Sequence, residues 1–195
     1  SIHAWAAHIP GVKVVVPSTA GECKGLLKTA IRDNDPVMFF EHKMLYTTKF
    51  NDVPEVEEDV CIPFGRARIV AEGADITVVT NSMMTIKAEK AVRQLQKEGI
   101  SAELIDLRTI VPLDTETIIR SVKKTGKLLI VDEGHLSFGI TGEIASRIMP
   151  DVFYDLDAPI QRMGTADVPL PFSPALEFPL IPDEKKIAAK IREMV

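Results

Sequence analysis

The sequence contains little of what marks several protein classes. It has only two cysteines, Cys23 and Cys61, with no CxxC pair and no histidine at ligand spacing, so neither a disulfide framework nor a zinc site is predicted. No apolar run approaches the roughly 18 residues that a membrane span needs. No secretion signal is recognisable, so we expect a reducing compartment, the cytoplasm or, in a eukaryote, the mitochondrial matrix.

An excess of basic charge is also missing. The chain carries 23 Lys and Arg against 28 Asp and Glu, a net charge of -5, and no dense stripe of basic residues. Proteins that bind nucleic acid need such a positive footprint. With 46% hydrophobic and 26% charged residues the composition is that of an ordinary globular protein. We therefore expect a soluble protein without a nucleic-acid or membrane partner.

The most informative stretch that is present runs from Pro17 to Tyr46. Its spacing predicts an amphipathic helix that begins at a capping box, Thr19 with Glu22, and ends before Pro36. Residues 37–41 follow as a buried strand. The helix face predicted to be buried carries Cys23, Leu26, Leu27, Ala30 and Ile31.

The carboxyl end of this helix is acidic. The last carbonyls of a helix form the negative end of its dipole and favour Lys or Arg nearby, but the chain has Asp33 and Asp35 there. One interpretation is a solvated acidic turn. The other is a cage of hard oxygen ligands for a cation. The sequence alone does not decide between these two interpretations.

Strand and helix signals alternate along the rest of the chain. The pattern predicts a mostly parallel sheet covered on both faces, a three-layer α/β/α fold. Residues 1–46 form a β-α-β piece, residues 47–63 an acidic, proline-containing linker, and residues 64–195 a second domain. In that domain we expect strands at 66–70, 76–80, 102–105, 127–131 and 160–163, and helices at 83–97, 114–123, 138–149 and 182–194.

Two further patterns invite functional interpretations that we do not adopt. Gly134, Gly139 and Gly142 lie between a strand and a helix, where phosphate loops occur, but their spacing fits a tight turn better than a nucleotide motif. His135 stands at a strand end beside acidic residues, which is more typical of a surface or interface histidine. Asp114 is expected to cap a helix.

Six segments, in order, resemble one family. They are HIPGVKVVVPSTAGECKGLLKTAIRDNDPVMFFEHKMLY, ELIDLRTIVPLD, SVKKTGKLLIVDEG, SFGITGEIASRI, LDAPIQRMGTADVPLP and ALEFPLIPD. Together they resemble the β subunit of the thiamine diphosphate-dependent 2-oxo acid dehydrogenases of the pyruvate, branched-chain and acetoin types. The resemblance covers essentially the whole chain.

The resemblance implies a fold and an activity. Residues 1–46 would be the carboxyl-terminal part of a pyrimidine-binding domain, and residues 64–195 a transketolase C-terminal-like domain. The whole enzyme would decarboxylate pyruvate or a related 2-oxo acid and pass the acyl unit to a lipoyl group, with thiamine diphosphate and magnesium as cofactors. Its partners would be an α subunit, a second β subunit and the lipoyl-bearing acyltransferase.

The resemblance also assigns residues. A potassium ion is held in relatives by positions matching Ala30, Ile31, Asp33 and Asp35, although several relatives have Asn at the last of these. Asp157 matches a position that docks the acyltransferase. The family's catalytic glutamate and histidine fall before Ser1 and no DG-rich thiamine motif occurs, so we expect a fragment or processed product without catalytic or cofactor-binding residues, inactive alone.

Two other functions remain. The chain could belong to another transketolase-like thiamine enzyme, or it could be a non-catalytic interaction module. The acidity of the linker and the segment DNDPVMFFEHKMLY argue against the first. An α-type or lipoyl partner would argue against the second.

Overall fold

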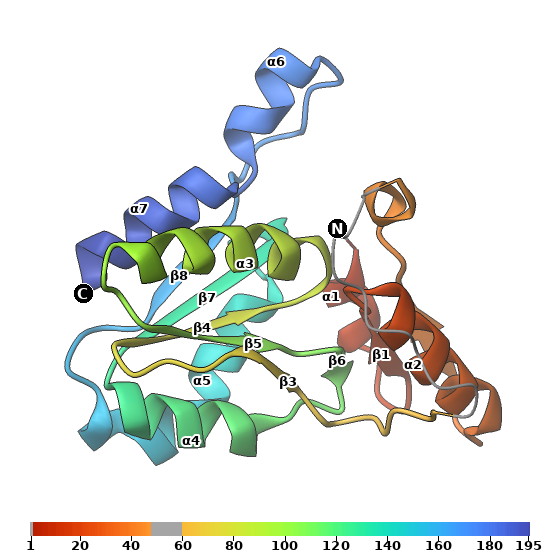
Figure 1. Ribbon diagram of the computed structural model, residues 1–195. Helices are drawn as coiled ribbons and strands as arrows, with labels where there is room; N and C mark the ends of the chain where they lie inside the picture. Colours follow the sequence, from red (N-terminus) through yellow and green to blue (C-terminus); the bar gives the residue numbers. More distant parts are fainter. Residues whose placement is uncertain (1, 48–59) are drawn as a thin grey trace.

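The computed structural model describes residues 2–47 and 60–195, which we call the amino-terminal unit and the carboxyl-terminal unit. Figure 1 shows the amino-terminal unit against one edge of a larger layered body. The predicted linker, 47–63, lies mostly outside the described residues. The elements of the amino-terminal unit are α1 (His3–Ala7), β1 (Lys13–Val15), α2 (Ala20–Arg32), β2 (Val37–Phe39) and the 3-10 helix η1 (Lys43–Tyr46).

The carboxyl-terminal unit supplies the second sheet and its covering helices. Strands β5, β4, β7 and β8 are parallel, and β3 pairs antiparallel with β5 at one edge. Helices α3 and α7 cover one face, and α4 and α5 the other (Figure 1). The elements are β3 (Arg68–Ala71), β4 (Ile76–Thr80), α3 (Ser82–Lys97), β5 (Ala102–Asp106), β6 (Thr109–Val111), α4 (Thr115–Thr125), β7 (Leu128–His135), α5 (Ile140–Val152), η2 (Phe153–Asp155), β8 (Gln161–Thr165), α6 (Pro174–Glu177), η3 (Phe178–Leu180) and α7 (Glu184–Met194). This arrangement confirms the predicted three-layer fold with a mostly parallel sheet.

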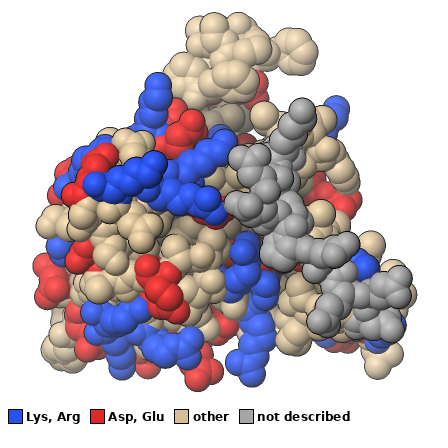
Figure 2. Space-filling view, viewed as in Figure 1, with Lys and Arg blue, Asp and Glu red and all other residues tan. Residues whose placement is uncertain are grey.

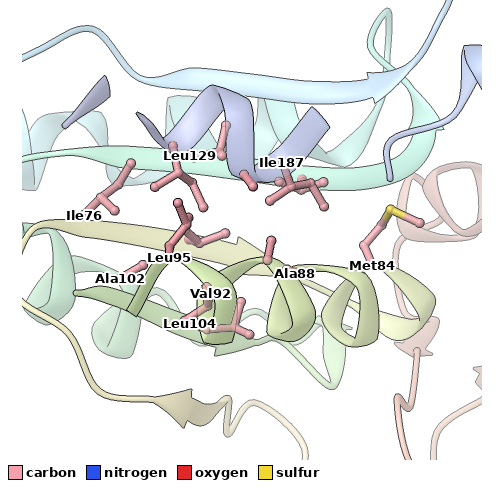
Figure 3. Packing of buried hydrophobic residues seen from close by; sticks show 14 of the residues in the cluster. Ile76, Met84, Ala88, Val92, Leu95, Ala102, Leu104, Leu129 and Ile187 are labelled. Carbon is pink, nitrogen blue, oxygen red and sulfur yellow. The ribbon is translucent and has the colours of Figure 1, made fainter. Parts of the chain in front are cut away.

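Apolar side chains fill both sides of the five-stranded sheet. Figure 3 shows the cluster under α3 and α7, in which Leu95 of α3 and Ile187 of α7 meet Leu129 of β7. A second cluster lies under α4 and α5 and takes in Ala6 and Val14 from the amino-terminal unit. The two units therefore share part of one core.

Local signals account for the helix ends. The Thr19 side chain accepts a hydrogen bond from the backbone N–H of Glu22, as the capping box predicts, but the Glu22 carboxylate reaches the N–H of Ser18. Asp114 caps α4 through the N–H of Thr117. Gly126 ends α4 with φ at 67°, a conformation that glycine adopts without strain.

A three-stranded sheet joins the units. Strand β1 pairs in parallel with β2 and antiparallel with β6. Strand β6 was not predicted from the sequence, because it is only three residues long and its pairing partner, β1, is almost one hundred residues away. Strand β6 thus holds the amino-terminal unit to the other.

The predicted burial of α2 was partly wrong. Leu26 is buried, but Leu27 is 43% exposed and Ile31 is 77% exposed, whereas the charged Glu22 is buried. Helical periodicity identifies an apolar face without saying what covers it. Strand β2, predicted to be buried, is partly exposed. No helix in the described ranges is long and apolar enough to cross a membrane.

Candidate functional site

The carboxyl edge of the five-stranded sheet has the geometry of a ligand site. Strands β4 and β7 are neighbours, yet the helices that follow them, α3 and α5, lie on opposite faces of the sheet. Open α/β sheets bind ligands at such a switch point, beyond the carboxyl ends of the strands. Asn81 follows β4 there, and Asp132 and Glu133 lie near the end of β7. In this protein the amino-terminal unit covers the position.

Asp132 is the buried anchor of this contact. Its carboxylate lies 3.0 Å from Nε2 of His3 and accepts a hydrogen bond of 3.0 Å from the side-chain amide of Asn81. Burial raises the pKa of Asp132, but the hydrogen bonds and charge of these partners outweigh it, so the pKa lies below its ordinary value. His3 and Asp132 are both almost completely buried.

A second histidine meets the next residue of β7. His42 Nε2 lies 2.7 Å from the Glu133 carboxylate, and this contact lowers the pKa of Glu133 despite the opposing effect of burial. Between the two histidines is a hollow of about 300 Å³, lined in addition by Asn81 and Ser82. The contacts of His3, His42 and Asp132 were not predicted from the sequence, because the residues that meet are distant from one another along the chain.

A buried charge cluster forms a second contact between the units. Glu22 at the start of α2 lies 2.6 Å from Arg68 of β3 and 2.8 Å from Arg108, which follows β5. Burial raises the pKa of Glu22, but the two guanidinium groups bring it below its ordinary value. The side chain of Arg108 therefore reaches across to α2.

Asp106 at the end of β5 completes the cluster. It is fully buried and lies 3.4 Å from Arg68. Burial and the negative charge of Glu22 raise the pKa of Asp106 to about 7, with Arg68 acting in the opposite direction. The cluster thus joins Glu22 of the amino-terminal unit to Arg68 and Arg108 of the other unit, with Asp106 beside Arg68.

The residues predicted to hold potassium do lie together at the end of α2. The backbone N–H of Asp33 bonds to the Ala30 carbonyl, while Nζ of Lys13 lies 2.7 Å from the Asp33 carboxylate and 3.0 Å from that of Asp35. Lys13 lowers the pKa of Asp33 through its hydrogen bond. The contact of Lys13 with these carboxylates was not predicted from the sequence. Lys13 supplies the positive charge that is favoured at the carboxyl end of a helix.

The types of group present suit a hard cation, since carboxylate oxygens and the backbone carbonyls of the last helical turn, those of Ala30 and Ile31, are oxygen ligands. The Lys13 ammonium, however, already neutralises both carboxylates. Among the described residues, no group of three or more His, Cys, Asp or Glu side chains could hold a metal ion.

Asp157 lies on the surface near the end of α4. Its backbone N–H donates a 2.8 Å hydrogen bond to the Gly126 carbonyl, and its carboxylate lies so close to Gly126 that an added Cβ there would be 2.2 Å away. The exposed Phe153 and Tyr154 precede it. The backbone of Asp157 is therefore held to the end of α4, and its side chain is exposed.

The glycine turn before α5 has a steric explanation. A Cβ on Gly139 would lie 2.1 Å from the carbonyl oxygen of His135, so only glycine fits without movement. Nδ1 of His135 lies 2.8 Å from the Ala166 carbonyl oxygen. Both observations concern the local turn, and the absence of a nucleotide site there remains a prediction.

Comparison with known families explains the two units. The model of the transketolase C-terminal domain matches residues 65–187, and that of the transketolase pyrimidine binding domain matches residues 1–49. The chain belongs to the transketolase family. This confirms the transketolase-like fold that the sequence implied.

The relatives within this family include dehydrogenase subunits. The chain is 48% identical over 188 residues to the pyruvate dehydrogenase E1 component subunit beta of Rickettsia felis, covering 96% of this chain and 57% of the relative. It is 44% identical to the 2-oxoisovalerate dehydrogenase subunit beta of Bacillus subtilis, over 100% of this chain and 59% of the relative. It is 47% identical to the acetoin:2,6-dichlorophenolindophenol oxidoreductase subunit beta of Cupriavidus necator, over 95% and 54%. The predicted resemblance to these β subunits is confirmed, and the chain spans little more than half their length.

A solved structure shows the same fold. The chain aligns with a split gene transketolase, described as an inactive beta4 tetramer, with a TM-score of 0.79 and 25% identity. The alignment covers 98% of this chain and 60% of the other. The same fold therefore occurs in that transketolase at 25% sequence identity.

Proposed function

We propose that this chain is a region of the β subunit of a thiamine diphosphate-dependent 2-oxo acid dehydrogenase and that it serves assembly. The identities of 44–48% to β subunits of pyruvate and 2-oxoisovalerate dehydrogenases support this assignment. Thiamine diphosphate supplies the carbanion chemistry by which such enzymes decarboxylate a 2-oxo acid. The described side chains would shape the subunit contacts around that centre.

One observation carries the assembly role. Residues 166–181, which we call the arm, extend away from the body and are mostly uncharged on the visible face (Figures 1 and 2). Phe172 is 101% exposed. The other large exposed apolar side chains of the arm are Val168, Leu170, Leu176 and Phe178. Apolar surface of this extent is typical of a protein–protein contact.

The base of the arm is held firmly. The Ala166 N–H donates to the Leu180 carbonyl, and Nζ of Lys186 donates to the carbonyls of Pro179 and Ile181 at 2.6 and 2.8 Å. An arm fixed at its base loses little conformational entropy on binding. This supports the interpretation that it is a built docking element, and the partner that we propose for it is the α subunit.

The remaining assignments follow the family. We propose residues 1–46 as the pyrimidine-binding part, 47–63 as a linker and 64–195 as the transketolase C-terminal-like domain. A second β subunit and the lipoyl-bearing acyltransferase would be further partners, with Asp157 contacting the latter because exposed carboxylates attract a basic domain. Potassium at Ala30, Ile31, Asp33 and Asp35, magnesium with the thiamine cofactor, and a cytoplasmic or mitochondrial-matrix location complete the proposal.

Co-expression with the α subunit of a closely related dehydrogenase tests the proposal. We expect the α subunit to co-purify with this chain, and Phe172→Ser with Leu176→Ser to reduce the recovered complex at least tenfold. Ile9→Ser, a similar change at an exposed residue outside the arm, is the control. Turnover of pyruvate by this chain with thiamine diphosphate and magnesium, but without an α subunit, would contradict the assembly role.

A second candidate is a transketolase or another thiamine enzyme of the same fold, which the split gene transketolase structure supports. Its 25% identity is well below the 44–48% of the dehydrogenase relatives. Co-purification with a lipoyl protein favours the dehydrogenase, because transketolases have no lipoyl acceptor. The third alternative, a stand-alone interaction module, predicts neither partner.

A further inference from the structure

The arm is attached to the body at both of its ends, and by different elements. At its first end, the Asp167 carboxylate accepts hydrogen bonds from the backbone N–H and the hydroxyl of Ser137, at 3.2 and 2.6 Å. Nδ1 of His135 lies 2.8 Å from the neighbouring Ala166 carbonyl oxygen. At its second end, lysines of α3 and α7 donate hydrogen bonds to carbonyls of residues 178–182. The arm, which leaves the body beside α7 in Figure 1, therefore joins the loop after β7 to the layer of α3 and α7.

Lys186 makes most of the contacts at the second end. Its Nζ donates hydrogen bonds to the carbonyl oxygens of Pro179 and Ile181, at 2.6 and 2.8 Å, and lies 3.5 Å from that of Phe178. Phe178 and Pro179 belong to the short 3-10 helix η3, and the last carbonyls of a helix lack partners within it. An ammonium group has three hydrogens to donate, so it suits carbonyls that converge in this way.

The position of Lys186 in α7 indicates that its charge serves the arm and not its own helix. Lys186 is the third residue of α7, whose N-cap is Asp183. A positive charge in the first turn opposes the helix dipole. Nζ lies 3.9 Å from the Asp183 carboxylate, much further than from the two nearest carbonyls of the arm. Lys87 of α3 donates a 3.0 Å hydrogen bond to the Pro182 carbonyl and so holds the chain just after the arm.

Between its two ends the arm is stiff and makes few other polar contacts. In the part of the chain that the structure describes, the hydrogen bonds of residues 168–177 stay within the arm, such as those from the N–H groups of Leu176 and Glu177 to the Ser173 carbonyl. Prolines, each of which fixes one backbone angle, recur along the arm at Pro169, Pro171, Pro174 and Pro179. A stiff segment that is held at its ends takes its direction from them.

We propose that Lys186 is a positioning residue for docking: its ammonium group holds the arm in the projecting orientation in which the arm binds its partner. The inference rests on the proposed function, in which that partner is the α subunit, and it names the residue that sets the orientation. When only a fraction of a protein has the conformation that binds, the apparent dissociation constant rises by the inverse of that fraction. Removing the ammonium group lowers this fraction but leaves the exposed apolar side chains of the arm in place.

The matched variants Lys186→Met and Lys185→Met test the first step, the hold on the arm. Both remove one positive charge from the first turn of α7 and keep an unbranched apolar side chain, but Lys185 is exposed and donates to none of the described arm carbonyls. Hydrogen exchange of the Ala166 amide, which bonds to the Leu180 carbonyl, reports opening of the arm's base. We expect Lys186→Met to raise its exchange rate about tenfold and Lys185→Met to leave it unchanged. Amides of β4 should exchange at the wild-type rate in both variants, which excludes a general loss of stability.

Binding kinetics with the α subunit of a closely related dehydrogenase test the second step. We expect Lys186→Met to lower the association rate constant about tenfold, because fewer molecules present the arm correctly, and to leave the dissociation rate constant within about threefold of the wild type. Phe172→Ser, which removes an exposed ring of the arm, should instead raise the dissociation rate constant. Lys186→Arg keeps a positively charged donor and should return the association rate constant to within about threefold of the wild type.

Several results would overturn the inference. They are an unchanged exchange rate of the Ala166 amide in Lys186→Met, an equal effect of Lys185→Met, and an association rate constant that does not fall. Faster dissociation as the only change would also overturn it, because Lys186 would then contact the partner directly.

The two measurements separate this inference from the proposed function. If the wild type binds the α subunit and Lys186→Met behaves as the wild type, the inference fails alone. If the Ala166 amide exchanges faster in Lys186→Met but no chain, the wild type included, binds an α subunit, the proposed function fails, and the hold of Lys186 on the arm is supported by the exchange rates.

Discussion

The two units of this molecule achieve their structure by different means. The carboxyl-terminal unit surrounds a five-stranded sheet with helices on both faces and fills both sides with apolar residues. The amino-terminal unit has two strands of its own, leaves Leu27 and Ile31 of α2 exposed, and relies on β6 and on buried polar contacts for its position. One unit is stabilised by its own core, and the other mainly by its neighbour.

This difference suggests how each unit contributes to assembly. The amino-terminal unit has exposed apolar surface on α2, and charged groups, Glu22 with Arg68 and Arg108, form its contact with the other unit, which we call the junction. Such a unit is suited to being covered by other chains. A unit with helices packed on both faces of its sheet is suited to presenting a rigid docking element such as the arm. The following predictions are ways to break or sharpen this contrast.

The largest effect is expected at the junction. Glu22→Gln removes the carboxylate partner of Arg108 and leaves Arg68 with Asp106 alone, in a partly buried position, which should lower the free energy of unfolding by about 3–5 kcal/mol. Urea denaturation followed by circular dichroism measures it. Glu89→Gln, which breaks an exposed ion pair on α3, should change stability by less than about 0.5 kcal/mol. Equal effects of the two changes would mean that the junction contributes no more than a surface pair.

The next contrast compares the cores. Leu104→Ala on β5 removes a fully buried side chain and should cost about 2–5 kcal/mol. Leu27→Ala on α2 removes a side chain that is 43% exposed, so the loss should be under about 1 kcal/mol. Thermal and urea unfolding of both variants give the comparison. If Leu27→Ala costs as much as Leu104→Ala, α2 has an apolar partner outside the described residues, such as a second chain.

The sequence predicted the carboxyl-terminal unit much better than the junction. The cap of α4 at Asp114, its end at Gly126 and the bounds of β4 depend on signals within a few residues. The contact of His3 with Asp132 joins residues 129 positions apart, and no local pattern marks it. Burial of Glu22 could not be foreseen for the same reason, because its two partners, Arg68 of β3 and Arg108 after β5, are far from it in sequence.

The candidate site shows the same division. The carbonyls and carboxylates at the end of α2 were found from helix chemistry and from the family resemblance. Lys13, which binds Asp33 and Asp35, lies on β1 and was missed because strand pairing brings it there. Likewise the exposure of the aromatic residues near α5 depends on the packing of the whole unit, which sequence periodicity does not describe.

The pH dependence of stability should report on the junction. The pKa of Asp106 is about 7 in the folded chain and about 3.9 when unfolded, so the folded state binds more protons between these values. Stability should therefore fall as pH rises from about 5 to 7, by at most about 1.4 kcal/mol per pH unit. Glu22, whose pKa is lowered, contributes the opposite slope only at lower pH, below its unfolded value.

Asp106→Asn isolates this effect. The variant keeps the shape of the side chain but cannot ionise, so its unfolding free energy should be nearly constant between pH 5 and 7. Urea titrations at intervals of half a pH unit measure the slope. Asp75→Asn, at a carboxylate near the opposite end of the sheet, should leave the wild-type slope unchanged. A wild-type protein without the slope would show that Asp106 ionises normally.

The smallest effect concerns potassium at the end of α2. Lys13 already neutralises much of the charge of Asp33 and Asp35, so the stabilisation of the wild type by the proposed potassium ion, relative to sodium, should be small. Lys13→Met removes this charge while keeping the aliphatic part of the side chain, and leaves the two carboxylates for a free cation. We expect the variant to have a melting temperature about 2 °C higher in potassium than in sodium at equal ionic strength, a shift that corresponds to a fraction of 1 kcal/mol. Asp33→Ala in the same background should abolish the difference, because it removes a ligand.

If Lys13→Met melts at the same temperature in both salts, the two carboxylates bind only the ammonium group of Lys13 and the proposed potassium site is wrong. A clear difference already present in the wild type would show that the ion and Lys13 bind together.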